Sequence, residues 1–127
     1  SPHDHDTPLV DFWEIVKQAP VGGFVLPFAN PRHAHEWRVL RDSPPRDNQF
    51  IAAGVIDTLT NFVEHEQVVA DRLETVARAI GDPARVIACT DCGFDTSAGL
   101  GRVAPSVVWS KFRSMSKGAE IATKLLF

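Results

Sequence analysis

Three short apolar segments alternate with stretches in which hydrophobic residues recur every three or four positions. The apolar segments are bounded by glycine, proline, asparagine or aspartate, which is typical of buried strands. They occupy residues 22–28, 50–56 and 85–89. The helical spacing predicts four helices, at 7–20, 32–41, 64–80 and 104–125. This alternation predicts parallel strands joined by helices.

Residues with known preferences for helix ends support these bounds. Thr7 is the expected cap of the first helix, Pro8 its first residue, and Pro20 ends it. Gly81 fits the C-terminal cap position of the 64–80 helix. Pro105 opens the last helix.

The length sets the size of the fold. The chain has 127 residues, and its strand–helix units follow one another at roughly 30-residue intervals. A complete (β/α)₈ barrel needs about 250 residues. We therefore expect one α/β domain, residues 1–127, forming half of a TIM barrel with about three parallel strands alternating with four helices. A small open α/β sheet is the alternative, and either form leaves two exposed sheet edges.

Composition narrows the function classes. Hydrophobic residues make up 44% of the chain and charged residues 23%, which predicts a packed core. The net charge of −3 gives no electrostatic reason to expect nucleic acid or an anionic membrane as a partner. No apolar run approaches the roughly 20 residues that span a bilayer. With two cysteines and no signal-peptide pattern, a cytoplasmic protein is expected.

The most informative chemistry follows the third predicted strand. Cys92 lies in a glycine-rich loop at the carboxyl end of this strand, where α/β proteins build active sites. It is a candidate metal ligand or nucleophile, or an ordinary buried thiol. Cys89 and Cys92 also form a Cys-x-x-Cys pair. A zinc ribbon needs a second pair, and a redox motif needs its first cysteine exposed at a helix start, whereas Cys89 lies on the strand.

Three separated motifs occur in the chain, FANPRHAHEW at 28–37, AGVID at 53–57 and TDCGF at 90–94. Together, and in this order, they resemble the catalytic C-terminal barrel of the cobalamin-independent methionine synthase family. Its relatives include methionine-synthase-like proteins and the epoxyalkane:coenzyme M transferases. The resemblance runs from about Pro2 to the end of the chain and is limited to the C-terminal half of that barrel.

The resemblance implies a zinc-dependent transferase, similar to the enzymes that methylate homocysteine from 5-methyltetrahydropteroyltriglutamate. In that family zinc holds the acceptor thiol as a thiolate, which attacks a methyl or epoxide carbon. Cys92 matches the family's last zinc ligand. Asp57 matches an Asp on the family's active-site face, and Arg32 lies near the residues that follow the family's zinc Glu, so both are expected to bind the substrate. No catalytic residue is assigned, and the partners implied are a small thiol and an alkyl donor.

Three departures from the family pattern change this expectation. The family's His-x-Cys zinc ligands are expected just before Ser1, so the zinc ligand set within this chain is incomplete. Pro27 stands where the family has a zinc-binding Glu, and Leu59 where the methionine synthases have a His. These departures favour a relative that uses another methyl or alkyl donor, and predict little activity for the isolated chain.

Two further interpretations remain open. The chain is alternatively a non-catalytic half-barrel or assembly module, which pairs with itself or with the missing N-terminal half to cover its sheet edges. Cys89 and Cys92 would alternatively serve a thiol redox function.

Several residues also have purely structural explanations. Asp57 would cap the loop after its strand, and Arg32 would help to hold the loop shape. His33 and His35 are two positions apart, so on a helix they diverge and do not share a metal. Glu64 is expected in the first turn of a helix, where acidic residues favour the helix dipole, and no chemistry is assigned to it.

Overall fold

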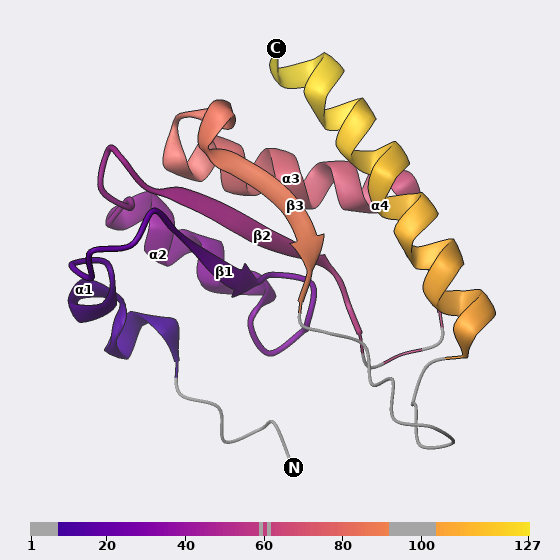
Figure 1. The fold of residues 1–127 in the computed structure, drawn as a ribbon, viewed down its shortest axis with the longest axis horizontal. Coiled ribbons are helices and arrows are strands. Elements are labelled where there is room, and N and C mark those ends of the chain that lie inside the picture. Colours follow the sequence, from indigo (N-terminus) through magenta and orange to yellow (C-terminus); the bar gives the residue numbers. More distant parts are fainter. Residues whose placement is uncertain (1–7, 59, 61, 92–103) are drawn as a thin grey trace.

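Three parallel strands lie side by side in one sheet, in the order β1-β2-β3 (Figure 1). The computed structural model describes residues 8–58, 60, 62–91 and 104–127. The strands are β1 (Gly23–Pro27), β2 (Phe50–Ile56) and β3 (Val86–Thr90). Their arrowheads point to the same end of the sheet, as expected for parallel strands joined by helical crossovers.

Among the described residues, four α-helices and three 3₁₀ turns connect and flank the strands. They are η2 (Leu9–Asp11), α1 (Trp13–Val16), η3 (Ala34–Glu36), α2 (Trp37–Asp42), α3 (Glu66–Ile80), η4 (Pro83–Arg85) and α4 (Pro105–Leu126). The predicted α/β class, with three parallel strands alternating with four helices, is confirmed. In the described part of the chain, no helix is long and apolar enough to cross a membrane.

The prediction of a continuous first helix, over residues 7–20, is wrong in its extent. In place of a continuous helix, η2 is followed by Phe12 with φ −130° and then by the single turn α1. Tertiary partners explain the break. The Leu9 amide donates to Glu36 Oε2 at 2.5 Å, and the buried Trp13 indole N–H donates to the Ser43 carbonyl at 2.7 Å. These two anchors fix the chain in a shape that helical periodicity does not predict.

The third predicted helix ends at Ile80 as predicted but begins two residues later, at Glu66 in place of Glu64, and both ends carry local signals. The His65 side chain accepts a hydrogen bond from the Gln67 amide at the N-terminus of α3. Gly81 takes the left-handed conformation, with φ 82°, directly after its last residue. Glycine is favoured there because a Cβ is disfavoured at positive φ.

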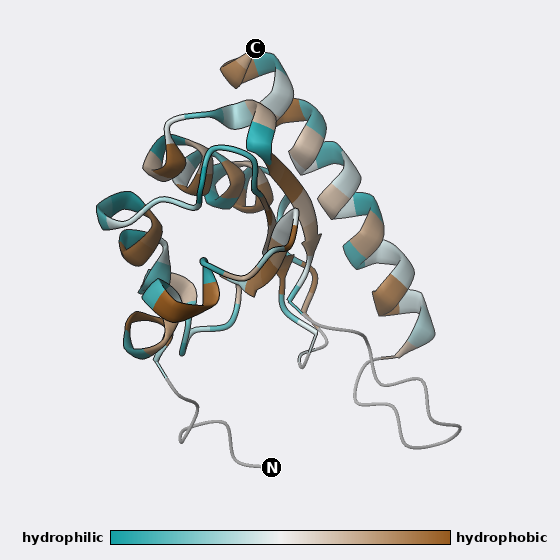
Figure 2. Cartoon of the chain, turned by 60° about the vertical axis from the view of Figure 1, so that its left-hand side comes forward, coloured by the Kyte–Doolittle hydropathy of each residue, from teal (hydrophilic) through white to brown (hydrophobic). Residues whose placement is uncertain are grey.

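The hydrophobic core lies between the helices and one face of the sheet. On that face the cross-strand neighbours Phe24, Ile51 and Val86 form one row, and Leu26, Ala53 and Ala88 form the next. Helix residues that pack against these rows are Leu40, Val69, Leu73, Val76, Ile80 and Ala122. Figure 2 shows the strands mostly in the hydrophobic colour.

The opposite face of the sheet is largely uncovered by the described residues. Val25, Ala52 and Ile87 are cross-strand neighbours on this face. The side chains of Val25 and Ile87 are 65% and 52% exposed, whereas Ala52 between them is buried. In a closed barrel this face would line the interior, which is normally filled by side chains. The chain therefore presents an apolar surface where a barrel has its centre.

Candidate functional site

Polar groups from all three strands meet at the carboxyl end of the sheet. Residues 28–30 follow β1, Asp57 follows β2, and Asp91 follows β3. Figure 1 shows the arrowheads of the three strands at this common end. This is the end at which open and closed parallel sheets place their ligands.

Asp91 links the ends of β3 and β1 across the central strand. Its Oδ1 accepts hydrogen bonds from the amides of Phe28 at 3.2 Å and Ala29 at 3.0 Å, and the Asn30 amide also bonds to this carboxyl group. The Asp91 amide itself donates to the Ile56 carbonyl at 2.9 Å. One side chain thus satisfies the amides of the loop after β1 and holds the outer strand ends together.

Gly54 provides the space for this link. The Asp91 side chain passes directly over Gly54, close enough that a Cβ at this position would collide with Oδ1. The same Cβ would lie 2.8 Å from Asp91 Cα and 3.0 Å from Pro27 Cα. Because those two contacts are to backbone atoms, no side-chain rotation relieves them. The requirement for glycine here is one of space, since Gly54 does not have a positive φ.

The environment of Asp91 raises the pKa of its carboxyl group to about 6. Burial is the largest cause, and the nearby charge of Asp57 adds to it, while the amide hydrogen bonds oppose the shift. The other carboxyl oxygen, Oδ2, is buried and has no hydrogen-bond partner among the described residues. Asp91 and Asp57 are therefore neighbours, and no described residue donates a hydrogen bond to the second Asp91 carboxyl oxygen.

The loop after β2 holds Asp57 from two sides. Its side chain is almost fully buried, and its Oδ2 accepts a hydrogen bond from the Thr60 hydroxyl at 3.0 Å. Its amide donates to Glu64 Oε2 at 2.7 Å. The Thr60 contact agrees with a loop-capping role, while the position beside Asp91 agrees with a role in ligand binding. Both interpretations of Asp57 keep structural support.

Glu64 is a residue whose environment the sequence did not reveal. It precedes α3 and is buried, and its Oε1 accepts a hydrogen bond from the Lys111 ammonium group at 2.8 Å. The expectation that Glu64 merely favours the helix dipole is therefore wrong. A signal was present in α4, because Lys111 lies on the same helical stripe as Met115, Gly118 and Ala122.

Arg32 lies in a tight loop after β1. Its amide donates to Asn30 Oδ1 at 2.9 Å, and the Asn30 carbonyl accepts the amides of His33 and Ala34. The His33 ring forms a hydrogen bond with Glu36 and so helps to hold this loop. Asn30 is buried and the Arg32 side chain is partly buried. These contacts account for the loop shape, and a substrate role for Arg32 stays a prediction.

The predicted metal ligand, Cys92, lies outside the described residues, as does Leu59. Among the residues that the structure describes, no three His, Cys, Asp or Glu side chains cluster as a metal site requires. Pro27 is the last residue of β1, and its side chain offers no ligand atom to a metal. The described donors alone do not fit a zinc centre.

Cys89 is a poor candidate for redox chemistry. It lies on β3 as the cross-strand neighbour of Gly54, partly buried. Burial, with a smaller contribution from Asp91, raises the pKa of the Cys89 thiol to about 11. Because the thiolate is the reactive form, this shift disfavours the redox interpretation.

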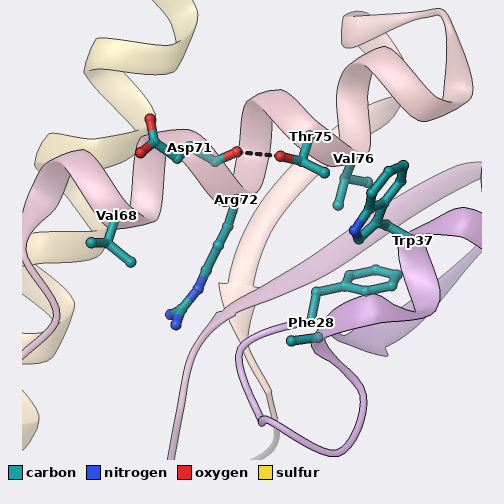
Figure 3. Close-up of a pocket in the computed structure, with 8 residues that line it drawn as sticks. Phe28, Trp37, Val68, Asp71, Arg72, Thr75 and Val76 are labelled. Atoms are coloured by element: carbon teal, nitrogen blue, oxygen red, sulfur yellow. Dashed lines mark hydrogen bonds between the residues drawn. The ribbon is translucent and has the colours of Figure 1, made fainter.

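A separate hollow of about 200 Å³ lies between α2 and α3, away from the uncovered face of the sheet (Figure 3). Phe28 and Trp37 lie on one side of it, and Val68 and Asp71 come from α3. Arg72 extends from α3 toward the end of β2, where it donates to the Val55 carbonyl at 2.9 Å. Because the Arg72 guanidinium group already donates to a strand carbonyl, the hollow offers mainly apolar contacts to a ligand.

Comparisons with known proteins support the fold. No protein-family model and no curated protein matches the chain. Among solved structures, the chain is similar to a B12-independent methionine synthase from Shewanella sp. W3-18-1, determined in complex with selenomethionine. The TM-score is 0.66 at 23% identity over 88% of this chain. The chain spans 29% of the length of that enzyme, so the likeness concerns one segment of it.

Proposed function

We propose that this chain is a segment of a methionine-synthase-like transferase, which transfers a methyl or alkyl group to a small thiol. The observation that carries the proposal is the likeness of its fold to a B12-independent methionine synthase over 88% of the chain. The motifs that resemble this family lie at the strand ends where Asp57 and Asp91 meet, which supports the same assignment.

Named residues have distinct roles in this proposal. Asp57 and Arg32 bind the substrate from the loops after β2 and β1. Carboxylate oxygens suit an ammonium group, and a guanidinium fork suits a carboxylate or sulfonate, so an amino acid thiol or a sulfonated thiol fits this pair. Asp91, whose buried Oδ2 has no described partner, lies near Asp57 and links the loop after β1 to the end of β3.

Cys92 would supply one zinc ligand, and the remaining ligands would come from outside the described residues. Bound zinc would supply the means to hold the acceptor thiol as a thiolate near neutral pH. The described residues do not form the zinc centre by themselves. Their contribution is to bind and orient the substrate.

Zinc content and ligand binding test this proposal. We expect the purified chain to bind L-selenomethionine in a calorimetric titration, and to retain supplied zinc once it is combined with the N-terminal half of the barrel, which by resemblance carries the other ligands. Cys92→Ser should abolish zinc retention by the combined halves, whereas Cys89→Ser, a matched control on the preceding strand β3, should leave zinc retention intact. Failure to bind L-selenomethionine, together with zinc retention that is indifferent to Cys92→Ser, would refute the assignment.

A second candidate function is supported by the uncovered sheet face. Val25 and Ile87 form an exposed apolar row that a half-barrel assembly module would bury against a second copy of the chain or against the missing N-terminal half. Sedimentation should then show a dimer that Val25→Lys dissociates. Val10→Lys, at a similarly exposed position outside the sheet, should leave it intact. A monomeric chain at high concentration would contradict self-association.

A further inference from the structure

Lys111 and Glu64 form an ion pair sealed inside the fold. Lys111 comes from α4 and Glu64 from the loop before α3, and their side chains are 0% and 1% exposed. The Lys111 ammonium also lies 5.1 Å from the centre of the Phe62 ring. Burying two charges costs nearly as much as their attraction returns, so such a pair is a weak source of stability. Its geometry points to a different use.

The two oxygens of Glu64 face different elements. Oε1 accepts from Lys111, while Oε2 accepts the Asp57 amide at 2.7 Å. Arg72 lies 3.6 Å from the same Oε2 and donates to the Val55 carbonyl at 2.9 Å. The register between β2 and β3 shifts between Gly54 and Ile56, so this network holds β2 beside the irregularity in its pairing.

We propose that Glu64 and Lys111 are positioning residues that set Asp57 for ligand binding. Lys111 orients the Glu64 carboxylate, and the carboxylate fixes the Asp57 amide and the start of its loop. Because Lys111 lies on α4, the helix and the ligand-binding end of β2 move as one unit. The inference deepens the proposed function and rests on it only for the choice of ligand.

Three variants separate positioning from folding. Lys111→Met leaves the buried Glu64 carboxylate with only Arg72, 3.6 Å away, as an ionic partner among the described residues, and this loss alone can prevent folding. The double variant Glu64→Gln/Lys111→Met removes both charges, so it should fold while offering Asp57 only a neutral acceptor. Lys124→Met, on an exposed part of the same helix, is the matched control.

Two measurements on the full chain are informative. The first is the amide proton shift of Asp57, which should lie downfield in the wild type and move upfield in the double variant as the charge-assisted bond is lost. The second is the affinity for L-selenomethionine, which should weaken about tenfold in the double variant and stay unchanged in Lys124→Met.

The outcomes distinguish this inference from the proposed function. An unchanged Asp57 shift in the folded double variant would overturn the positioning role, whatever the ligand. Equal L-selenomethionine affinity in the wild type and the double variant would overturn it as well. If the wild type does not bind L-selenomethionine but the Asp57 shift moves as expected, the positioning role stands and the proposed ligand falls.

Discussion

Replacing Gly54 by alanine should disrupt the link between the three strand ends. The added Cβ would meet the Asp91 side chain and would lie 2.8 Å from Asp91 Cα, so β3 must move away from β2. That movement lengthens the hydrogen bonds from the Phe28 and Ala29 amides to Asp91 Oδ1. A single methyl group thus changes the geometry at the carboxyl ends of all three strands.

The magnitude follows from opposing contributions. Overpacking a tight site costs about 1–3 kcal/mol, and weakening hydrogen bonds to a carboxyl group costs about 1.5–3 kcal/mol. Alanine is otherwise favoured over glycine within a strand by about 0.5–1 kcal/mol. The steric and hydrogen-bond effects win, and Gly54→Ala should lower the free energy of unfolding by about 2–4 kcal/mol.

Urea unfolding followed by circular dichroism measures this change, and the midpoint should fall by about 1–3 M. Gly22→Ala is the control, because a Cβ there meets no atom within 4 Å. A double-mutant cycle with Asp91→Ala should show coupling, since Asp91→Ala removes part of the clash. If Gly54→Ala is as stable as Gly22→Ala, or costs the same with and without the Asp91 carboxyl group, the proposed link is refuted.

Other predictions concern single sites. Gly81→Ala should lower the free energy of unfolding by about 1–2 kcal/mol, because alanine is disfavoured at φ 82°; an unchanged urea midpoint would contradict this. Arg72→Met should cost about 1–3 kcal/mol in the same assay, because it leaves the Val55 carbonyl without its donor. In a Cys92→Ser background, iodoacetamide should modify Cys89 at pH 8 about 100-fold more slowly than a free thiol, and the rate should rise until about pH 11. A rate near that of glutathione would show that the Cys89 pKa is not raised.

The fold was predictable where the signals are local. The strand at 50–56 has the bounds that its apolar run predicts, and α3 ends at the glycine that its pattern requires. The first helix was not predictable in the same way. Leu9 and Trp13 are placed by partners about 30 residues away, and periodicity carries no information about such contacts.

The candidate site was predictable only in outline. The parallel arrangement brings Asp57 and Asp91 to the same end of the sheet, because residues that follow parallel strands lie at their common carboxyl end. The bonds that fix them depend on distant partners. Glu64 and Lys111 are 47 positions apart, and a charged residue is usually expected to face water.

The two proposed functions differ in what they require of the carboxyl end of the sheet, not of its apolar face. Both need something to cover Val25 and Ile87, so the apolar face does not separate them. An assembly module, however, has no use for a buried carboxyl oxygen without a partner, and burying one lowers stability. The described residues place such an oxygen, Asp91 Oδ2, beside Asp57 and at the strand ends where parallel sheets bind ligands. No residue in the described part of the chain donates to this oxygen, and a ligand that did so would offset the cost, so on this ground we favour the transferase over the assembly module.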